Sequence, residues 1–273
     1  MGETTFPTGT VDTHMHFYDQ RFPSAPAAVL RPPDATVADY TELQRELGLQ
    51  RVVVVQPTTY GMDNTCQLEA MASFGDDSRG VMVVDASVTD DELARLTALG
   101  VRGARFHLLP GGAVPAEMLV PTAERIAEYG WHIQLQTNGR DLTDHLARLQ
   151  ALPCDLVVDH VGRFMPPVPE TDASFAALRT LMAGGRCWVK LSAPYESSVT
   201  GPPAYRDVAD LARVLVEDAP ERMLWASNWP HPGQEDPPSP DVLAELIADW
   251  VGSAAVLQQI LVDNPTAFYG FES

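Results

Sequence analysis

Arg51–Thr58 reads RVVVVQPT, with four consecutive valines ahead of a polar glutamine and a proline. An uninterrupted run of β-branched residues is typical of a strand in a parallel sheet, where both faces are buried. Similar short runs recur along the whole chain, and with this one they predict eight strands. The others are Thr10–Tyr18, Gly80–Ala86, Val101–Leu109, Trp131–Thr137, Asp155–Gly162, Cys187–Ser192 and Met223–Asn228.

Amphipathic stretches with helical spacing lie between these runs. Thr89 and Glu92 have the spacing of a capping box, and Gly48, Gly100 and Gly130 stand where helices end before the next strand. The predicted helices are Asp34–Leu49, Asp63–Phe74, Thr89–Leu99, Pro121–Tyr129, Asp141–Leu152, Ala173–Ala183, Ala204–Asp218 and Asp241–Trp250.

Regular alternation of strand and helix predicts right-handed crossovers and a parallel sheet. At 273 residues, the best solution is a single α/β domain over residues 1–273, closed as a (β/α)8 TIM barrel. A doubly wound open sheet is the alternative, but no glycine-rich phosphate loop follows the first strand. In a barrel the functional site lies at the C-terminal ends of the strands.

The composition excludes several classes of partner. Lys and Arg number 18 against 37 Asp and Glu, which gives a formal net charge of −19. A chain this acidic is unsuited to nucleic acid or an anionic membrane surface, so anion binding requires a local cluster of arginines in a pocket. Three cysteines without paired spacing predict a reducing, cytoplasmic location. Met1–Thr10 lacks the apolar segment of a signal peptide, and no apolar run is long enough for a membrane span.

Polar side chains gather at the predicted strand ends. Residues two apart on a strand point to the same side, which places His14 with His16, Arg105 with His107, and Gln134 with Gln136. Further polar residues end or follow the other strands: Gln56, His160, Arg163, Tyr195, Glu196, Asn228 and His231. Polar groups converging on one barrel end predict a functional pocket there.

Four motifs resemble the amidohydrolase superfamily: HMH at His14–His16, DHVGRF at Asp159–Phe164, LWASNWPHP at Leu224–Pro232 and LVDNPTAFYGF at Leu261–Phe271. The resemblance covers nearly the whole chain and is specific to the branch of 2-pyrone-4,6-dicarboxylate lactonases and galactarolactone isomerases. The isomerase resemblance is supported further by Gly111–Val114 (GGAV), Thr143–Gln150 (TDHLARLQ) and Tyr195–Ser198 (YESS).

The resemblance implies roles for individual residues. His14 and His16 match the pair that binds or polarises the lactone carbonyl, and His160 matches the histidine of the sixth strand. Arg105 and Arg206 match the arginines that clamp substrate carboxylates. We therefore expect catalytic roles for His14, His16, His160, Asn228 and His231. Substrate contacts are expected from Gln56, Arg105, His107, Gln136, Arg163, Tyr195 and Arg206.

The eighth-strand motif departs from the lactonase pattern. Lactonases have TDWPHP, where the aspartate is the general base, whereas this chain has SNWPHP with Asn228. An amide does not take a proton from water at neutral pH. Metal-dependent relatives also have a histidine on the fifth strand, where this chain has Gln136. His14, His16 and His160 remain as a possible Zn²⁺ site, but with two ligands replaced we expect no essential metal and no cofactor.

Three functions follow as hypotheses. The first is a hydrolase that opens a small carboxylated lactone, with His160, His231 or Asp12 replacing the lost base. The second is a lactone isomerase, in which a hydroxyl of a sugar-diacid lactone attacks its own carbonyl. The third is a non-catalytic binder of a small polyanionic acid.

Overall fold

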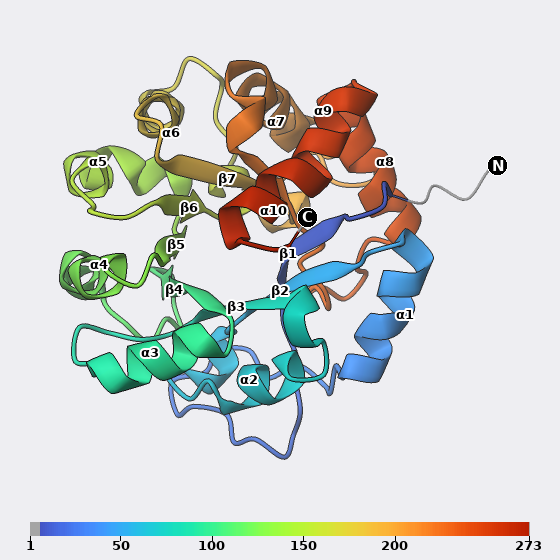
Figure 1. Cartoon of the computed structure of the whole chain (residues 1–273). Helices are drawn as coiled ribbons and strands as arrows, with labels where there is room; N and C mark the ends of the chain where they lie inside the picture. The colour runs from blue at the N-terminus through green and yellow to red at the C-terminus, as the bar shows by residue number, and fades with distance from the viewer. Residues whose placement is uncertain (1–5, 273) are drawn as a thin grey trace.

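The computed structural model describes residues 6–272 and contains one eight-stranded parallel sheet (Figure 1). The strands pair in sequence order, each with the next. They are β1 (Val11–Met15), β2 (Arg51–Val55), β3 (Ser78–Met82), β4 (Val101–His107), β5 (His132–Gln136), β6 (Leu156–Val158), β7 (Cys187–Leu191) and β8 (Met223–Trp225).

The sheet closes where the first and last strands meet. The Asn228 amide donates to the His14 carbonyl at 2.9 Å, and the His16 amide donates to the Trp229 carbonyl at 2.9 Å. These bonds join the chain after β8 to the end of β1. The predicted (β/α)8 barrel is therefore confirmed, and the open, doubly wound alternative is wrong.

Helices cover the outside of the barrel between successive strands (Figure 1). All eight predicted helices are present, with ends that differ by up to a few residues. They are α1 (Val37–Leu47), α2 (Thr65–Met71), α3 (Asp90–Ala98), α4 (Leu119–Ala127), α5 (Leu142–Gln150), α6 (Ala173–Ala183), α7 (Arg206–Asp218) and α8 (Pro240–Val251).

The predicted helix ends are confirmed in part. Gly48, Gly100 and Gly130 have φ of 75°, 93° and 69°, the left-handed backbone that follows a helix. Thr89 caps α3 by accepting from the Glu92 amide. The return half of the predicted capping box is wrong, because the Glu92 carboxylate bonds Arg95 instead.

The C-terminal segment adds elements that the periodicity did not predict. These are α9 (Ala254–Gln258), a π-helical turn (Gln259–Asp263) and α10 (Asn264–Tyr269). Figure 1 shows α10 lying across the barrel. Tyr269 and Phe271 pack into a buried cluster with interior valines of the strands, among them Val11 and Val53. This segment therefore completes the barrel core.

Several predicted strands end earlier than expected. β6 stops at Val158 and β8 at Trp225, whereas the runs continue to Gly162 and Asn228. The residues beyond these strand ends leave the sheet and turn, which brings their side chains to the barrel mouth.

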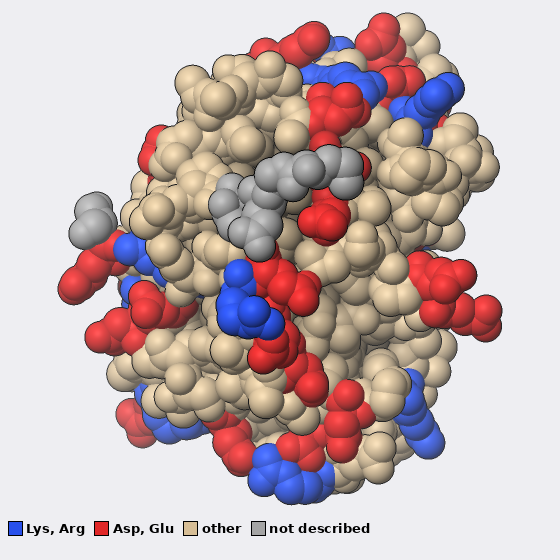
Figure 2. All heavy atoms as spheres, turned by 90° about the vertical axis from the view of Figure 1, so that its right-hand side faces the viewer, with Lys and Arg blue, Asp and Glu red and all other residues tan. Residues whose placement is uncertain are grey.

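Within residues 6–272 no helix combines the length and apolarity needed to cross a membrane. The prediction that Met1–Thr10 is not a signal peptide falls partly on residues 1–5, which lie outside the described residues. Figure 2 shows Asp and Glu spread over one face of the molecule, with arginines beside several of them.

Candidate active site

Left-handed backbone marks the turns after β6 and β8. His160, Val161 and Arg163 have φ of 56°, 54° and 47°, and Asn228 and His231 have φ of 59° and 62°. Non-glycine residues adopt this region at a cost of roughly 1–3 kcal/mol each, and such residues cluster at functional sites. The left-handed residues therefore indicate a functional site at the C-terminal end of the barrel.

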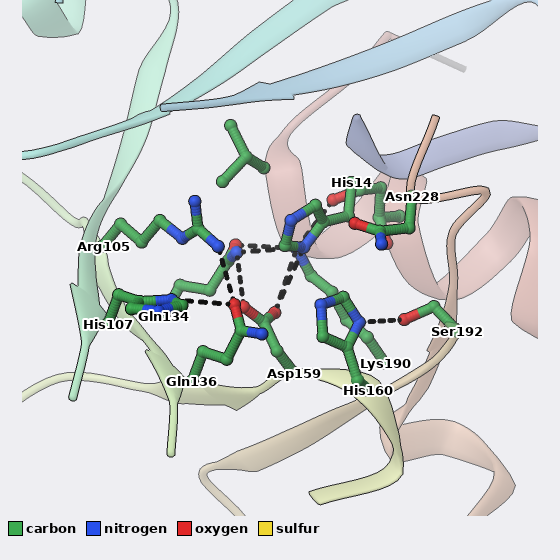
Figure 3. Close-up of polar contacts among 12 residues, drawn as sticks. His14, Arg105, His107, Gln134, Gln136, Asp159, His160, Lys190, Ser192 and Asn228 are labelled. Atoms are coloured by element: carbon green, nitrogen blue, oxygen red, sulfur yellow. Dashed lines mark hydrogen bonds and ion pairs between the residues drawn. The ribbon is translucent and has the colours of Figure 1, made fainter. Parts of the chain in front are cut away.

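A cavity of about 340 Å³ opens at this end, within the range of small-molecule sites. Its wall includes the apolar side chains of Val29 and Leu30 from the loop after β1. Eight of the twelve predicted site residues line it: His16, Arg105, His107, Gln136, His160, Arg163, Tyr195 and Asn228. Figure 3 shows Arg105 and His107 facing His14, His160 and Asn228 across the barrel end.

Arg105 is the buried cation of the cavity wall. Its side chain comes from β4 and is 5% exposed, and its Nη2 donates to Gln136 Oε1 at 2.7 Å. Its Nη1 donates to the Gln56 carbonyl. Both acceptors are neutral, and within residues 6–272 no carboxylate lies within 4.0 Å of the guanidinium. A buried guanidinium without a carboxylate partner is prepared to bind an anion.

Glu196 contributes a carboxylate to the same wall. Its Oε2 accepts from Arg163 Nε at 2.6 Å and from Gln136 Nε2 at 3.1 Å. Its Oε1 lies 3.7 Å from His160 Nε2. Burial alone would raise the pKa of Glu196, but His160 and Arg163 outweigh it and hold the pKa below its usual value. Glu196 is therefore an anion at neutral pH and faces the imidazole of His160.

His160 lies between Glu196 and a hydroxyl. Its Nδ1 is 2.8 Å from Ser192 Oγ, and its ring centroid is 4.9 Å from that of His14. Burial lowers the pKa of His160, so the ring is neutral at pH 7. A neutral imidazole beside a carboxylate can accept a proton and be stabilised once it is charged.

His14 and His16 form a contact inside the barrel. Their Nε2 atoms are 3.2 Å apart, and His16 Nδ1 is 2.7 Å from the Val55 carbonyl. His16 lines the cavity, whereas His14 is fully buried behind it. Burial holds the pKa of both rings well below the usual value, with Arg105 adding to the effect on His16.

A buried ion pair between Lys190 and Asp159, which the sequence analysis does not predict, lies beside His14. Lys190 of β7 and Asp159 after β6 are both fully enclosed, with Nζ 3.8 Å from Oδ1. The Lys190 ammonium also donates to the Thr13 carbonyl and to Gln134 Oε1, each at 2.7 Å. A signal was available, because Lys190 is the chain's single lysine and interrupts the apolar run CWVKL.

Asn228 belongs to a short chain of hydrogen bonds. Its Nδ2 donates to the Tyr195 hydroxyl at 2.9 Å, and that hydroxyl lies 2.8 Å from His231 Nδ1. Burial lowers the pKa of His231 to about 4. Asn228 and Tyr195 line the cavity, while His231 stands behind Tyr195 as its acceptor.

Three residues named from the sequence lie elsewhere. Gln56 is buried, and its Nε2 holds the loop after β2 by donating to the carbonyls of Gly61 and Asp63. Arg206 is exposed at the first residue of α7 and is not part of the cavity wall. Asp12 accepts from Tyr40 and Ser227 rather than facing the cavity, so it is not placed to replace a base.

Potential metal ligands occur at one place among residues 6–272, where atoms of His14, Asp159 and His160 lie within 4.8 Å of one another. This set has a carboxylate where the predicted zinc ligands have His16. The distances among these three ligand atoms suit a divalent cation, but the positive charge of Lys190 beside them disfavours its binding. Lys190 Nζ is 3.5 Å from His14 Nδ1, and its ammonium already neutralises Asp159.

The chain matches the amidohydrolase family over residues 11–271. It is 38% identical to D-galactarolactone isomerase of Agrobacterium fabrum over 97% of this chain and 92% of that protein. It is also 38% identical to 2-pyrone-4,6-dicarboxylate hydrolase of Comamonas testosteroni, over 96% of this chain and 90% of that protein. A crystal structure from Agrobacterium tumefaciens superposes with a TM-score of 0.93 at 37% identity, covering 98% of both chains. The protein is a member of the amidohydrolase family.

Proposed function

We propose that this enzyme acts on a small lactone that carries a carboxylate, and that it transfers the lactone acyl group from one oxygen to another. The observation that carries the proposal is the buried guanidinium of Arg105, which lines the cavity without a carboxylate partner among the described residues. A substrate carboxylate supplies the missing charge. The names of the two relatives, a lactone isomerase and a pyrone dicarboxylate hydrolase, support the same class of substrate.

The nucleophile we favour is a hydroxyl of the substrate itself. The turn after β8 offers the amide of Asn228, which is held by Tyr195 and does not accept a proton from water. An internal hydroxyl is oriented by binding and needs less help from a base. The acidic group in the wall, Glu196, also accepts hydrogen bonds from substrate hydroxyls, which favours a hydroxylated lactone over a flat pyrone.

The residues at the cavity wall then have separate roles in substrate binding and proton transfer. Arg105 fixes the substrate carboxylate, and His160 takes the proton from the attacking hydroxyl while Glu196 stabilises the imidazolium. The hydroxyl oxygen bonds the carbonyl carbon, the ring C–O bond breaks, and His160 returns the proton to the departing ring oxygen. The product is an isomeric lactone, with no net change in atoms or charge.

Hydrolysis is the second candidate. The 3.7 Å contact between Glu196 and His160 supports this candidate, in which the pair takes a proton from water in place of a carboxylate after β8. In that case the acyl group passes to water and the product is an open-chain acid.

The proposal is tested by following carboxylated lactones, both pyrone and sugar-acid, by proton NMR with the purified enzyme. We expect turnover of at least one of them and much slower turnover of its methyl ester. A ligand-dependent rise in melting temperature without turnover of any carboxylated lactone would favour the binder hypothesis instead.

Replacing Asn228 by Asp tests the role of the amide in the turn after β8. We expect Asn228→Asp to gain release of open-chain acid, because the new carboxylate can take a proton from water. A positioned base contributes ~10²-fold or more. The measurement is the ratio of open-chain acid to isomerised lactone in each enzyme. Asn228→Ala, which has neither the amide nor the carboxylate, is the control. An unchanged ratio in Asn228→Asp would show that a carboxylate at this position does not activate water.

Metal removal tests the proposed metal-free chemistry. We expect enzyme treated with a chelator, and shown by mass spectrometry to be free of zinc, to keep its full turnover. We expect added Zn²⁺ to bring no increase, because Arg105 and Lys190 already supply positive charge. Loss of turnover that Zn²⁺ restores would contradict this part of the proposal.

A further inference from the structure

Lys190 has an unusual place in this chain. It is the single lysine among 273 residues, and its side chain is fully buried in the barrel interior. It is not part of the cavity wall, so it does not contact the substrate. Burying an ammonium costs several kcal/mol unless it is paired and hydrogen-bonded. Its contacts therefore indicate what it does.

The tautomer of His16 follows from one contact. Its Nδ1 lies 2.7 Å from the Val55 carbonyl, which only accepts hydrogen bonds. The proton of the neutral ring is therefore on Nδ1, and Nε2 carries a lone pair. That lone pair points at His14 Nε2, 3.2 Å away.

The tautomer of His14 follows from Lys190 and Gln134. Lys190 Nζ lies 3.5 Å and Gln134 Nε2 3.2 Å from His14 Nδ1. The Gln134 amide is oriented by its other contacts, since its Oε1 accepts from Lys190 and its Nε2 donates to Asp159 Oδ2. Two donors and one acceptor, Asp159 Oδ1 at 3.3 Å, therefore face His14 Nδ1. The contact with the His16 Nε2 lone pair decides between them, because it needs a proton on His14 Nε2. The lone pair of the neutral ring is therefore on Nδ1, and the proton is on Nε2, which donates to His16 Nε2. Figure 3 shows Lys190, Gln134 and Asp159 around His14.

This arrangement excludes a metal from the two histidines. Two nitrogens bound to one zinc at ~2.1 Å are about 3.4 Å apart, close to the observed 3.2 Å. A shared metal needs a lone pair on both Nε2 atoms. His14 would then carry its proton on Nδ1 and donate it to Asp159 Oδ1, 3.3 Å away, as metal-bound histidines commonly do. Lys190 and Gln134 oppose that state.

We propose that Lys190 is a positioning residue that holds the proton of His14 on Nε2 and so keeps divalent cations away from the His14–His16 pair. Its ammonium neutralises Asp159 in place of a metal. This inference deepens the metal-free chemistry of the proposed function, but its tests do not depend on turnover.

The first test uses the unaltered protein. Histidine labelled with ¹⁵N gives distinct chemical shifts for the two tautomers, and the signals of His14 are assigned by their loss in His14→Gln. We expect a protonated Nε2 on His14 and a protonated Nδ1 on His16 at pH 7. A proton on His14 Nδ1 would overturn the proposal, whether or not the enzyme turns over a lactone.

The second test removes the ammonium. We expect Lys190→Met to bind Zn²⁺ about 10–100-fold more tightly than the unaltered protein, the size of effect that groups behind metal ligands usually have. Lys190→Arg, which keeps the charge, is the control and is expected to bind Zn²⁺ no better than the unaltered protein. Titration calorimetry with zinc chloride measures all three.

The outcomes separate the proposal from the proposed function. Equal zinc affinity in a folded Lys190→Met and the unaltered protein would overturn the role of Lys190. If Lys190→Met does not fold, the ¹⁵N chemical shifts of His14 in the unaltered protein decide whether the proposal stands. A protein with the expected tautomer that turns over no lactone would support Lys190 as the positioning residue and contradict the proposed function.

Discussion

Arg105→Met is expected to lower kcat/KM for a carboxylated lactone by ~10²–10³-fold. Removing one partner of a buried, hydrogen-bonded charge pair costs 2–5 kcal/mol, and each ~1.4 kcal/mol is a factor of ten. The loss should appear mainly in KM, because the contact with the carboxylate is present in both the ground state and the transition state. Steady-state kinetics on the acid and on its methyl ester measure the effect.

Two controls make this prediction specific. The methyl ester has no charge for Arg105 to bind, so its kcat/KM should fall far less than that of the acid. Arg206→Met should behave like the unaltered enzyme, because Arg206 is exposed on α7 and is not part of the cavity wall. Equal losses on acid and ester would show that Arg105 holds Gln56 and Gln136 in place rather than the substrate.

His160→Ala is expected to lower kcat by ~10²–10⁴-fold, the usual contribution of a positioned acid or base. KM should change little, because His160 acts on a proton rather than on the substrate carboxylate. Glu196→Gln should give a smaller loss of kcat, since it removes the charge that stabilises the imidazolium but leaves the ring in place. Added imidazole should restore part of the turnover of His160→Ala and none of that of Glu196→Gln.

The pH profile provides a further check on His160. Burial lowers its pKa below 6.5, so the neutral ring that accepts a proton persists below pH 6.5. We expect kcat to stay level as the pH falls through 6.5 and to decline only at lower pH. A decline centred above pH 6.5, or an unchanged kcat in His160→Ala, would remove His160 from the proton transfer.

The barrel could be predicted from the sequence because its signal repeats. Eight apolar runs such as Arg51–Thr58 alternate with helical patterns, and glycines such as Gly48 mark the helix ends. The segment from α9 to α10 could not be predicted in this way. Tyr269 and Phe271 are apolar residues in short helices, and their burial depends on the strands they cover.

The sequence predicts those site residues that lie at or just after the C-terminal ends of the strands. His16, Arg105, His160 and Asn228 leave their strands at the same end of the barrel and meet at one cavity. Arg206 is expected at the site only from the family resemblance, and it lies exposed at the first residue of α7. Its position is not at a strand end, so the rule that places the other side chains does not apply to it.

The sequence does not show how far below the cavity each polar side chain lies in the barrel interior. The HxH spacing places His14 and His16 on the same side, but only the closed barrel shows that His14 lies behind His16. Lys190 lies on β7 and Asp159 follows β6, and the folded barrel brings them within 3.8 Å of each other. The sequence also allows Asp12 as a base, but its carboxylate is buried and accepts from the Tyr40 hydroxyl of α1.

The central claim is that the acyl group of a carboxylated lactone passes to a hydroxyl of the same molecule. Turnover in ¹⁸O-enriched water, followed by NMR and mass spectrometry of the product, tests it most directly. We predict an isomeric lactone that contains no heavy oxygen, because no water enters the reaction. An open-chain acid carrying one ¹⁸O in its new carboxylate would contradict the claim and establish water as the nucleophile.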